Sequence, residues 1–128
     1  MTKHVKSLTY TPKIAAVLSG DCSQTIRVGR KVSVGDEILF HGWSGRPYRS
    51  KWDWRKRIVV DGIWDLLLDD ETVTFIEDDF SYPWDSSIVD LMAKEDFIDP
   101  PTGEALRDVL FKLNGIPKEP VHAQIIRW

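Results

Sequence analysis

Basic and aromatic side chains interleave between residues 46 and 57, within a chain whose net charge is −3. Six side chains in this run are Lys or Arg, one is Asp and three are aromatic. Cations bind phosphate groups and flat rings stack on unpaired bases, so the combination is typical of proteins that bind single-stranded or looped RNA. The residues of this run that we expect to contact nucleic acid are Arg46, Tyr48, Arg49, Lys51, Trp52, Trp54 and Arg55.

The two tryptophans of this run also fit a second interpretation, in which they fill the core beneath a solvated basic loop. Trp52 and Trp54 are two residues apart, so on an extended segment they point to the same side. Lys51, Asp53 and Arg55 then point to the opposite side. The spacing leaves both interpretations open.

Charge is divided unevenly along the sequence. Residues 1–57 hold 12 Lys and Arg against 4 Asp and Glu, a net +8, whereas residues 58–128 hold 5 against 16, a net −11. Because the Debye length is about 8 Å in physiological salt, a polyanion meets the local field rather than the total charge. The basic part is therefore a candidate contact surface for nucleic acid, and we interpret most of the acidic part as a solvated surface.

Length and composition indicate one globular domain that spans residues 1–128. The hydrophobic content of 42% is ordinary for a soluble protein, and no apolar run approaches the roughly 18 residues of a membrane span. The first residues lack the apolar segment of a secretory signal, and the single cysteine, Cys22, fits a reducing compartment. We therefore expect a cytoplasmic protein.

Hydrophobic patterns near the N-terminus predict a strand, a helix and a second strand. Alternation favours a strand over residues 6–10, and the Thr-Pro pair at residues 11–12 favours a helix start. The helix should end at Gly20, which can adopt the left-handed conformation. A strand over residues 24–28 follows, so residues 21–23 form a helix-to-strand turn, a common place for functional sites.

The remaining patterns predict short strands and helices in irregular order. Two strand pieces about a Gly-Asp turn lie over residues 32–43, and a β stretch over residues 57–68, bulged at Gly62, forms a hairpin with residues 72–76. Helices are expected over residues 87–94 and 103–113, and a last strand over residues 121–128. About six strands with two to three short helices indicate an α+β fold built on a small mixed or antiparallel β-barrel.

Two segments, Leu18–Arg27 and Val34–Phe40, resemble the signature of the ASCH domain family, which belongs to the PUA-like superfamily. The family pattern is a short helix, then G-x-K-x-x-T-x-R, then a V/T-G-D turn and a hydrophobic strand. The resemblance covers residues 8–40 well and the rest loosely, and implies a PUA-like pseudo-barrel with a cleft suited to RNA or a modified nucleoside. The residues in register with the pattern are Gly20, Thr25, Arg27, Gly35 and Asp36.

Some bacterial ASCH proteins resemble amidohydrolases that act on N4-acetylcytidine, and the motif lysine, the motif threonine and a later glutamate are their proposed catalytic set. In this sequence these positions fall on Cys22, on Thr25 and, within about one residue, on Glu95. A hydroxyl such as that of Thr25 is a weak nucleophile unless a neighbouring base accepts its proton, and Cys22 cannot supply that base as a lysine does. A Cys22 thiolate could itself be the nucleophile, with Arg27 lowering its pKa and Glu95 or His41 relaying protons, but a small side chain filling a turn is the simpler interpretation.

Three functions stay open at this point. The first is an RNA-binding or other nucleic-acid-binding module of the ASCH type, in which Arg27 joins the basic run; the absence of the motif lysine favours it. The second is an amidohydrolase acting on a modified nucleoside such as N4-acetylcytidine. The third is a protein-interaction module that uses Trp43 and the aromatic residues of the run. We expect no cofactor and no metal, because the histidines are scattered and the acidic run near residues 77–85 is typical of a solvated face.

Overall fold

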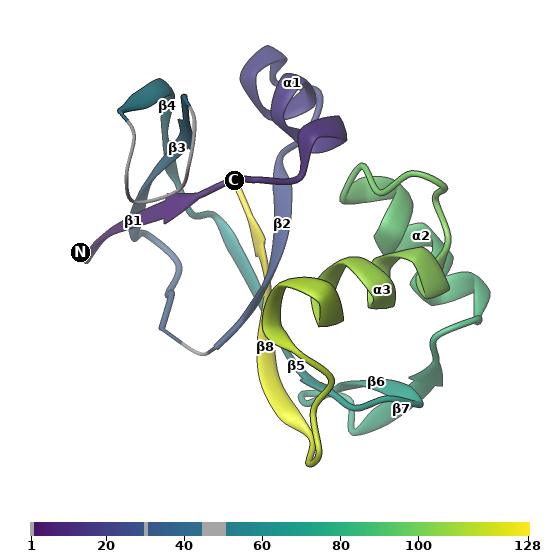
Figure 1. The fold of residues 1–128 in the computed structure, drawn as a ribbon. Coiled ribbons are helices and arrows are strands. Elements are labelled where there is room, and N and C mark those ends of the chain that lie inside the picture. Colours follow the sequence, from purple (N-terminus) through teal and green to yellow (C-terminus); the bar gives the residue numbers. More distant parts are fainter. Residues whose placement is uncertain (1, 30, 45–50) are drawn as a thin grey trace.

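The computed structural model describes residues 2–29, 31–44 and 51–128. Within these residues the chain has an α+β fold with eight strands in two sheets and three helices (Figure 1), which confirms the α+β part of the predicted fold class. The elements are β1 (Lys3–Ser7), α1 (Thr11–Ser19), β2 (Gln24–Val28), β3 (Glu37–Trp43), β4 (Trp52–Val59), β5 (Gly62–Leu68), β6 (Thr72–Phe75), β7 (Phe80–Pro83), α2 (Ser87–Glu95), α3 (Gly103–Asn114) and β8 (Val121–Arg127).

The strands form a three-stranded sheet in the order β1-β3-β4 and a five-stranded sheet in the order β2-β8-β5-β6-β7. β1 runs parallel to β3, and every other pairing is antiparallel. No closed barrel is detected in the part of the chain that the structure describes. The fold instead has two hydrophobic clusters. Strand β8 of the five-stranded sheet contributes to both, because Ile125 packs into one cluster and Ile126 into the other.

The prediction of one long β stretch over residues 57–68 is wrong, because the chain changes sheets in its middle. The Val60 amide donates to the Asp36 carbonyl in the first sheet, whereas the next amide, of Asp61, donates to the Arg127 carbonyl in the second. β4 therefore ends at Val59, and Gly62 begins a new strand rather than forming a bulge. This break, and the unpredicted strand β7, raise the strand count from about six to eight.

The first predicted strand is displaced, and the helix after it lies close to its expected place. β1 occupies residues 3–7 rather than 6–10, and residues 32–34 form no strand. Tyr10 rather than Thr11 is the N-cap of α1, with proline in its first turn. Gly20 ends the helix in the left-handed conformation, at φ 88°, as predicted. The hairpin of β5 and β6 is also confirmed.

Helices α2 and α3 lie side by side against the five-stranded sheet, whereas α1 lies beside the end of β2 (Figure 1). Ser86 and Thr102 cap α2 and α3 through their side-chain oxygens, as the sequence indicates. Apolar residues of α2 and α3 pack on β5, β6 and β8 in one cluster, and those of α1 pack on β3 and β4 in the other. This arrangement brings the first turn of α1, the middle of β2 and the end of α2 together.

Candidate active site

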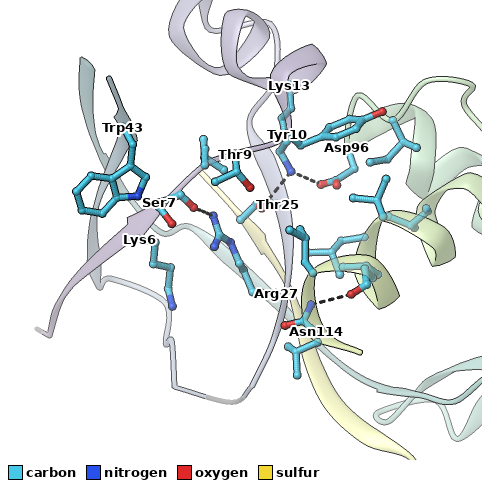
Figure 2. Close-up of a pocket in the computed structure, with 18 residues that line it drawn as sticks. Lys6, Ser7, Thr9, Tyr10, Lys13, Thr25, Arg27, Trp43, Asp96 and Asn114 are labelled. Carbon is cyan, nitrogen blue, oxygen red and sulfur yellow. Dashed lines mark hydrogen bonds and ion pairs between the residues drawn. The ribbon is translucent and has the colours of Figure 1, made fainter. Parts of the chain in front are cut away.

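A pocket of about 460 Å³ opens between α1, β2, the end of α2 and α3. Figure 2 shows its polar groups gathered near the middle, with Lys13 pointing down from α1 toward Thr25 on β2 and Asp96 just after α2. Leu106, Leu110 and other apolar side chains of α3 form one wall. A volume of this size is within the range of about 300–1,000 Å³ that is usual for small-molecule sites.

Lys13, Thr25 and Asp96 form a buried polar group in this pocket. The Lys13 Nζ donates to Thr25 Oγ1 at 3.0 Å and to Asp96 Oδ1 at 2.7 Å. The three residues are only 4%, 2% and 4% exposed. Buried charges and hydroxyls normally have partners, and here each member of the group satisfies another. The ammonium group, the hydroxyl and the carboxylate are thus held in one geometry.

The backbone at the end of α2 fixes the place of Asp96. The amide of Ile98 donates to the Ala93 carbonyl and the amide of Phe97 donates to the Lys94 carbonyl, which is the hydrogen-bond pattern of a Schellman motif. Phe97 has a φ of 57°, in the left-handed region that usually favours glycine. Asp96 is the C-cap residue, and the turn directs its carboxylate back toward α1.

Two further side chains tie the surrounding elements together. The Tyr10 hydroxyl, at the start of α1, accepts a hydrogen bond from the Asp99 amide at 3.1 Å, which joins α1 to the segment after α2. Gln24, on β2, donates to the Met92 carbonyl of α2 at 3.5 Å. Lys13, Thr25 and Asp96 therefore come from three elements that are also held to one another.

Electrostatics in this group depend on burial. Burial raises the pKa of the Asp96 carboxyl, whereas the ammonium group of Lys13 and the guanidinium of Arg27 act in the opposite direction. Isolated charges are unfavourable in such a site, and a close pair of opposite charges is tolerated. The contact of Lys13 with Asp96 therefore keeps both charges paired within the buried group.

Arg27 lies on β2 next to this group and lines the same pocket. Its Nη2 donates to the Ser7 carbonyl oxygen at 2.7 Å, and its guanidinium carbon is 5.9 Å from the centre of the Phe40 ring. Burial lowers the pKa of Arg27. Lys6 lines the pocket near Arg27, so this end of the pocket is cationic (Figure 2).

Cys22 does not line the pocket. Its side chain is 1% exposed in the cluster beneath α1, and its Sγ donates to the Gln24 carbonyl oxygen at 3.2 Å. Burial raises the pKa of the Cys22 thiol, so the expected lowering by Arg27 is wrong. The structure favours the interpretation of Cys22 as a small buried side chain that fills a turn.

Glu95 also lies outside the pocket lining, with a half-exposed side chain 4.0 Å from Arg127. The next residue along the chain, Asp96, is the one that faces the pocket. Sequence reasoning missed both Lys13 and Asp96 as site residues. A signal for Lys13 was present, because it shares the buried face of α1 with Ala16 and Val17 at helical spacing, and a lysine on an apolar face requires a buried partner.

Trp52 and Trp54 do not point to the same side, because a β-bulge separates them. Gly42 pairs with Trp54 and Trp43 pairs with Trp52, which leaves Asp53 as the extra residue. Trp54 packs into the cluster beneath α1, and Gly42 leaves room for its indole ring. Trp52 lies on the opposite face of the sheet.

We call the group of His41, Trp43, Trp52 and Arg55 the outer face of β3 and β4. The Trp52 ring stacks on the buried His41 ring at 3.9 Å, and the Arg55 guanidinium lies 5.0 Å from the centre of the Trp52 ring. Trp43 meets both other rings edge-on. Burial lowers the pKa of His41.

The other cations of the basic run divide between structural and exposed positions. Lys56 donates to the Val17 carbonyl oxygen at 2.7 Å and Arg57 pairs with Glu37 at 2.9 Å, so both contribute to the fold. Lys51 is exposed. Three predicted contact residues lie outside the described residues: Arg46, Tyr48 and Arg49.

Searches for metal ligands, for membrane spans and for related proteins gave the following results. Among residues 2–29, 31–44 and 51–128, no three His, Cys, Asp or Glu side chains are grouped so that they could hold a metal ion. Within the same ranges, none of the helices has the length and apolar character that a membrane span requires. Comparisons with models of known protein families, with curated proteins and with solved structures gave no match.

Proposed function

We propose that this chain is an ASCH-type module of the PUA-like superfamily that hydrolyses an amide on a modified nucleoside, with N4-acetylcytidine as the model substrate. The PUA-like pseudo-barrel belongs to the same proposal, with the two sheets as its two open halves. The order of elements supports it: a short helix, a strand with Thr25 and Arg27, a Gly-Asp turn before a hydrophobic strand, and a strand near the end of the chain.

One observation carries the proposal, namely the contact of Lys13 Nζ with both Thr25 Oγ1 and Asp96 Oδ1 in the lining of the pocket. In the family pattern an amine, a threonine hydroxyl and a carboxylate form the proposed catalytic set. Here Cys22 occupies the lysine position of the motif, but Lys13 brings an amine to the same threonine from α1. Asp96 supplies the carboxylate one residue after the expected Glu95.

The proposed reaction starts with attack of Thr25 Oγ1 on the acetyl carbonyl carbon. The hydroxyl proton passes to Lys13 Nζ as Lys13 passes one of its own protons to Asp96 Oδ1, with which it is hydrogen-bonded. The C–N bond then breaks, and the cytidine amino group leaves with the proton from Lys13. A water molecule, activated by the same amine, releases acetate from the Thr25 ester and restores the hydroxyl.

Incubating the protein with N4-acetylcytidine and separating the products by chromatography tests this proposal. The parent should release cytidine, and Thr25→Val should lower the rate at least about a thousandfold, since it removes the nucleophile while keeping the side-chain shape. Thr74→Val is the matched control, because Thr74 lies on β6 and bonds to Ser81 away from the pocket. A parent rate no higher than that of Thr25→Val would contradict the proposal.

The outer face of β3 and β4 favours a second candidate function, the binding of single-stranded nucleic acid. Trp52 offers a ring for stacking and Arg55 lies over that ring, an arrangement that suits a base and its phosphate. Lys51 adds an exposed cation beside them. The cations of the basic run that contribute to the fold, Lys56 and Arg57, are not part of this proposal.

A titration of intrinsic tryptophan fluorescence tests the second candidate. Short single-stranded RNA, duplex RNA and DNA are added at about 50 and about 200 mM salt, the range in which phosphate contacts show clearly. Saturable quenching by single-stranded RNA that weakens with salt is the expected result. No response to any of the polymers would remove the outer face as a nucleic-acid surface.

A further inference from the structure

Two cations line one end of the pocket, and a third acts on one of them from outside the lining. Lys6 and Arg27 line the pocket, and the charge of Lys31 acts on Lys6 together with that of Arg27. Burial and these two like charges lower the pKa of Lys6. Like charges repel one another, so this arrangement costs free energy in the absence of an anion.

In the part of the chain that the structure describes, carboxylates compensate this cluster only in part, through the charge of Asp96 on Arg27. Among the described residues, Asp96 is the one acidic residue in the pocket lining, and Lys13 already pairs with it. Lys6, Arg27 and Lys31 form no ion pair within the described ranges. The cationic end is therefore suited to an anionic group that comes from outside the chain.

The hydrogen-bond donors of Arg27 are largely available for such a group. A guanidinium has five N–H donors in a fixed fork that matches phosphate oxygens. Among the described residues, Arg27 makes one hydrogen bond, from Nη2 to the Ser7 carbonyl oxygen, and this bond orients the fork along the pocket (Figure 2). Lys6, on β1, adds a point charge at the same end.

We infer that the pocket takes a nucleotide rather than a free nucleoside, and that Lys6 and Arg27 bind its phosphate while the base lies toward Thr25 and Lys13. This inference rests on the proposed function for the orientation of the base. The phosphate belongs either to a free nucleoside monophosphate or to a strand, and both present the same anionic oxygens.

Calorimetric titration with cytidine and with cytidine 5′-monophosphate tests the inference without any turnover. The monophosphate should bind at least about tenfold more tightly, as expected for charge-assisted hydrogen bonds. Lys6→Gln should remove a large part of this preference. Lys3→Gln is the matched control, because Lys3 lies on the same strand but outside the pocket, and it should keep the preference.

Equal affinity of the parent for the two ligands would overturn the inference, as would the absence of binding by either. A preference that survives unchanged in Lys6→Gln would also overturn it, since the phosphate would then lie elsewhere. These readouts do not depend on catalysis. The inference and the proposed function can therefore fail separately.

Hydrolysis assays distinguish a failure of the phosphate-site inference from a failure of the proposed function. If N4-acetylcytidine and its 5′-monophosphate are hydrolysed with equal kcat/KM, the inference falls and the proposed function stands. If neither is hydrolysed but the monophosphate binds more tightly, the proposed function falls and the phosphate site stands. Tighter binding of a short single-stranded RNA than of the monophosphate would identify a strand as the source of the phosphate, and the reverse order would identify a free nucleotide.

Discussion

The pocket and the outer face of β3 and β4 hold polar and aromatic groups in opposite ways. In the pocket, Lys13, Thr25 and Asp96 are buried and bound to one another, so a single geometry is fixed. On the outer face, Trp52 lies over a buried histidine and Arg55 lies over the Trp52 ring, and both keep part of their surface exposed. A fixed, buried arrangement suits chemistry, whereas an accessible ring and cation suit binding.

Trp43 connects the two regions. It lines the pocket and also meets the Trp52 ring at 6.3 Å in an edge-on contact. A strand that stacks on Trp52 would therefore pass close to the pocket mouth. Substitutions in the two regions should nevertheless separate turnover from binding, and substitutions outside both regions should affect stability alone.

The largest change is expected for Lys13→Met, which leaves the Asp96 carboxylate buried without its counter-ion. Removing one partner of a buried pair costs about 4 kcal/mol, whereas replacing both partners is close to neutral. Lys13→Met should therefore lose about this much stability in urea unfolding at pH 7, and Lys13→Met with Asp96→Leu should recover most of it. A single variant as stable as the parent would show that the pair is not buried.

The pH dependence of Lys13→Met sharpens the same point. Without Lys13, burial raises the folded-state pKa of Asp96 further above its unfolded value near 3.9. A raised folded-state pKa contributes stability below the unfolded pKa, and this contribution is lost as pH rises through the folded pKa. The stability deficit of the variant should therefore be smallest near pH 4 and grow toward pH 8 in urea titrations.

The second largest change is expected for Trp54→Ala. Trp54 packs into the cluster beneath α1 and leaves no room for a Cβ at Gly42, so its loss creates a cavity. We expect a loss of about 3 kcal/mol in unfolding free energy, with little specific effect on RNA binding by the folded fraction. Stronger loss of RNA affinity than of stability would place Trp54 in the contact surface instead.

Trp52→Ala should have a smaller effect, and on binding rather than on turnover. Stacking on one ring contributes about 1–2 kcal/mol, so affinity for single-stranded RNA should fall at each salt concentration. Hydrolysis of N4-acetylcytidine should stay at the parent rate. Arg55→Ala is the companion variant, and it should reduce the salt slope by about 0.7. Equal RNA affinity of parent and Trp52→Ala would remove the distinction between the two regions.

The smallest effect is expected for Asp36→Asn. Asp36 lies in neither region, so this variant shows how far a change in stability alone alters the measurements. Hydrogen bonds from His4 and from the amides of Ser33 and Thr2 lower the pKa of Asp36 to about 2. A lowered folded-state pKa gives stability above the unfolded value near 3.9, which is lost as pH falls through about 2. Thermal unfolding should show a small loss in Tm at pH 7 that disappears toward pH 2.

The sequence predicts those parts of the fold that depend on local signals. The caps at Ser86 and Thr102, the left-handed residue Gly20 and the hairpin of β5 and β6 each follow from a few adjacent residues. The change of sheets at residues 60–61 does not, because it depends on hydrogen bonds to Asp36 and Arg127. The β-like hydrophobic pattern of residues 57–68 continues through residues 60–61, so the sequence gives no sign that one strand ends there and another begins.

The residues of the candidate site likewise divide into those that a local pattern predicts and those that depend on contacts between distant parts of the chain. Thr25 and Arg27 were identified from a local pattern, and both line the pocket. Asp96 is 83 residues from Lys13 in the sequence, and their contact depends on how α1 and α2 pack. The bulge at Asp53, which separates the faces of Trp52 and Trp54, likewise depends on pairing with β3. Alternation along one strand cannot reveal it.

The most direct test of the account compares the rate of cytidine release from N4-acetylcytidine by three proteins: the parent, Trp52→Ala, and Lys13→Met with Asp96→Leu. The double variant keeps a filled, folded pocket but lacks the buried amine and carboxylate. We predict equal rates for the parent and Trp52→Ala, and a rate at the uncatalysed background for the double variant. Turnover by the double variant at the parent rate, or none by the parent, would contradict the claim that the buried Lys13, Thr25 and Asp96 group performs the chemistry.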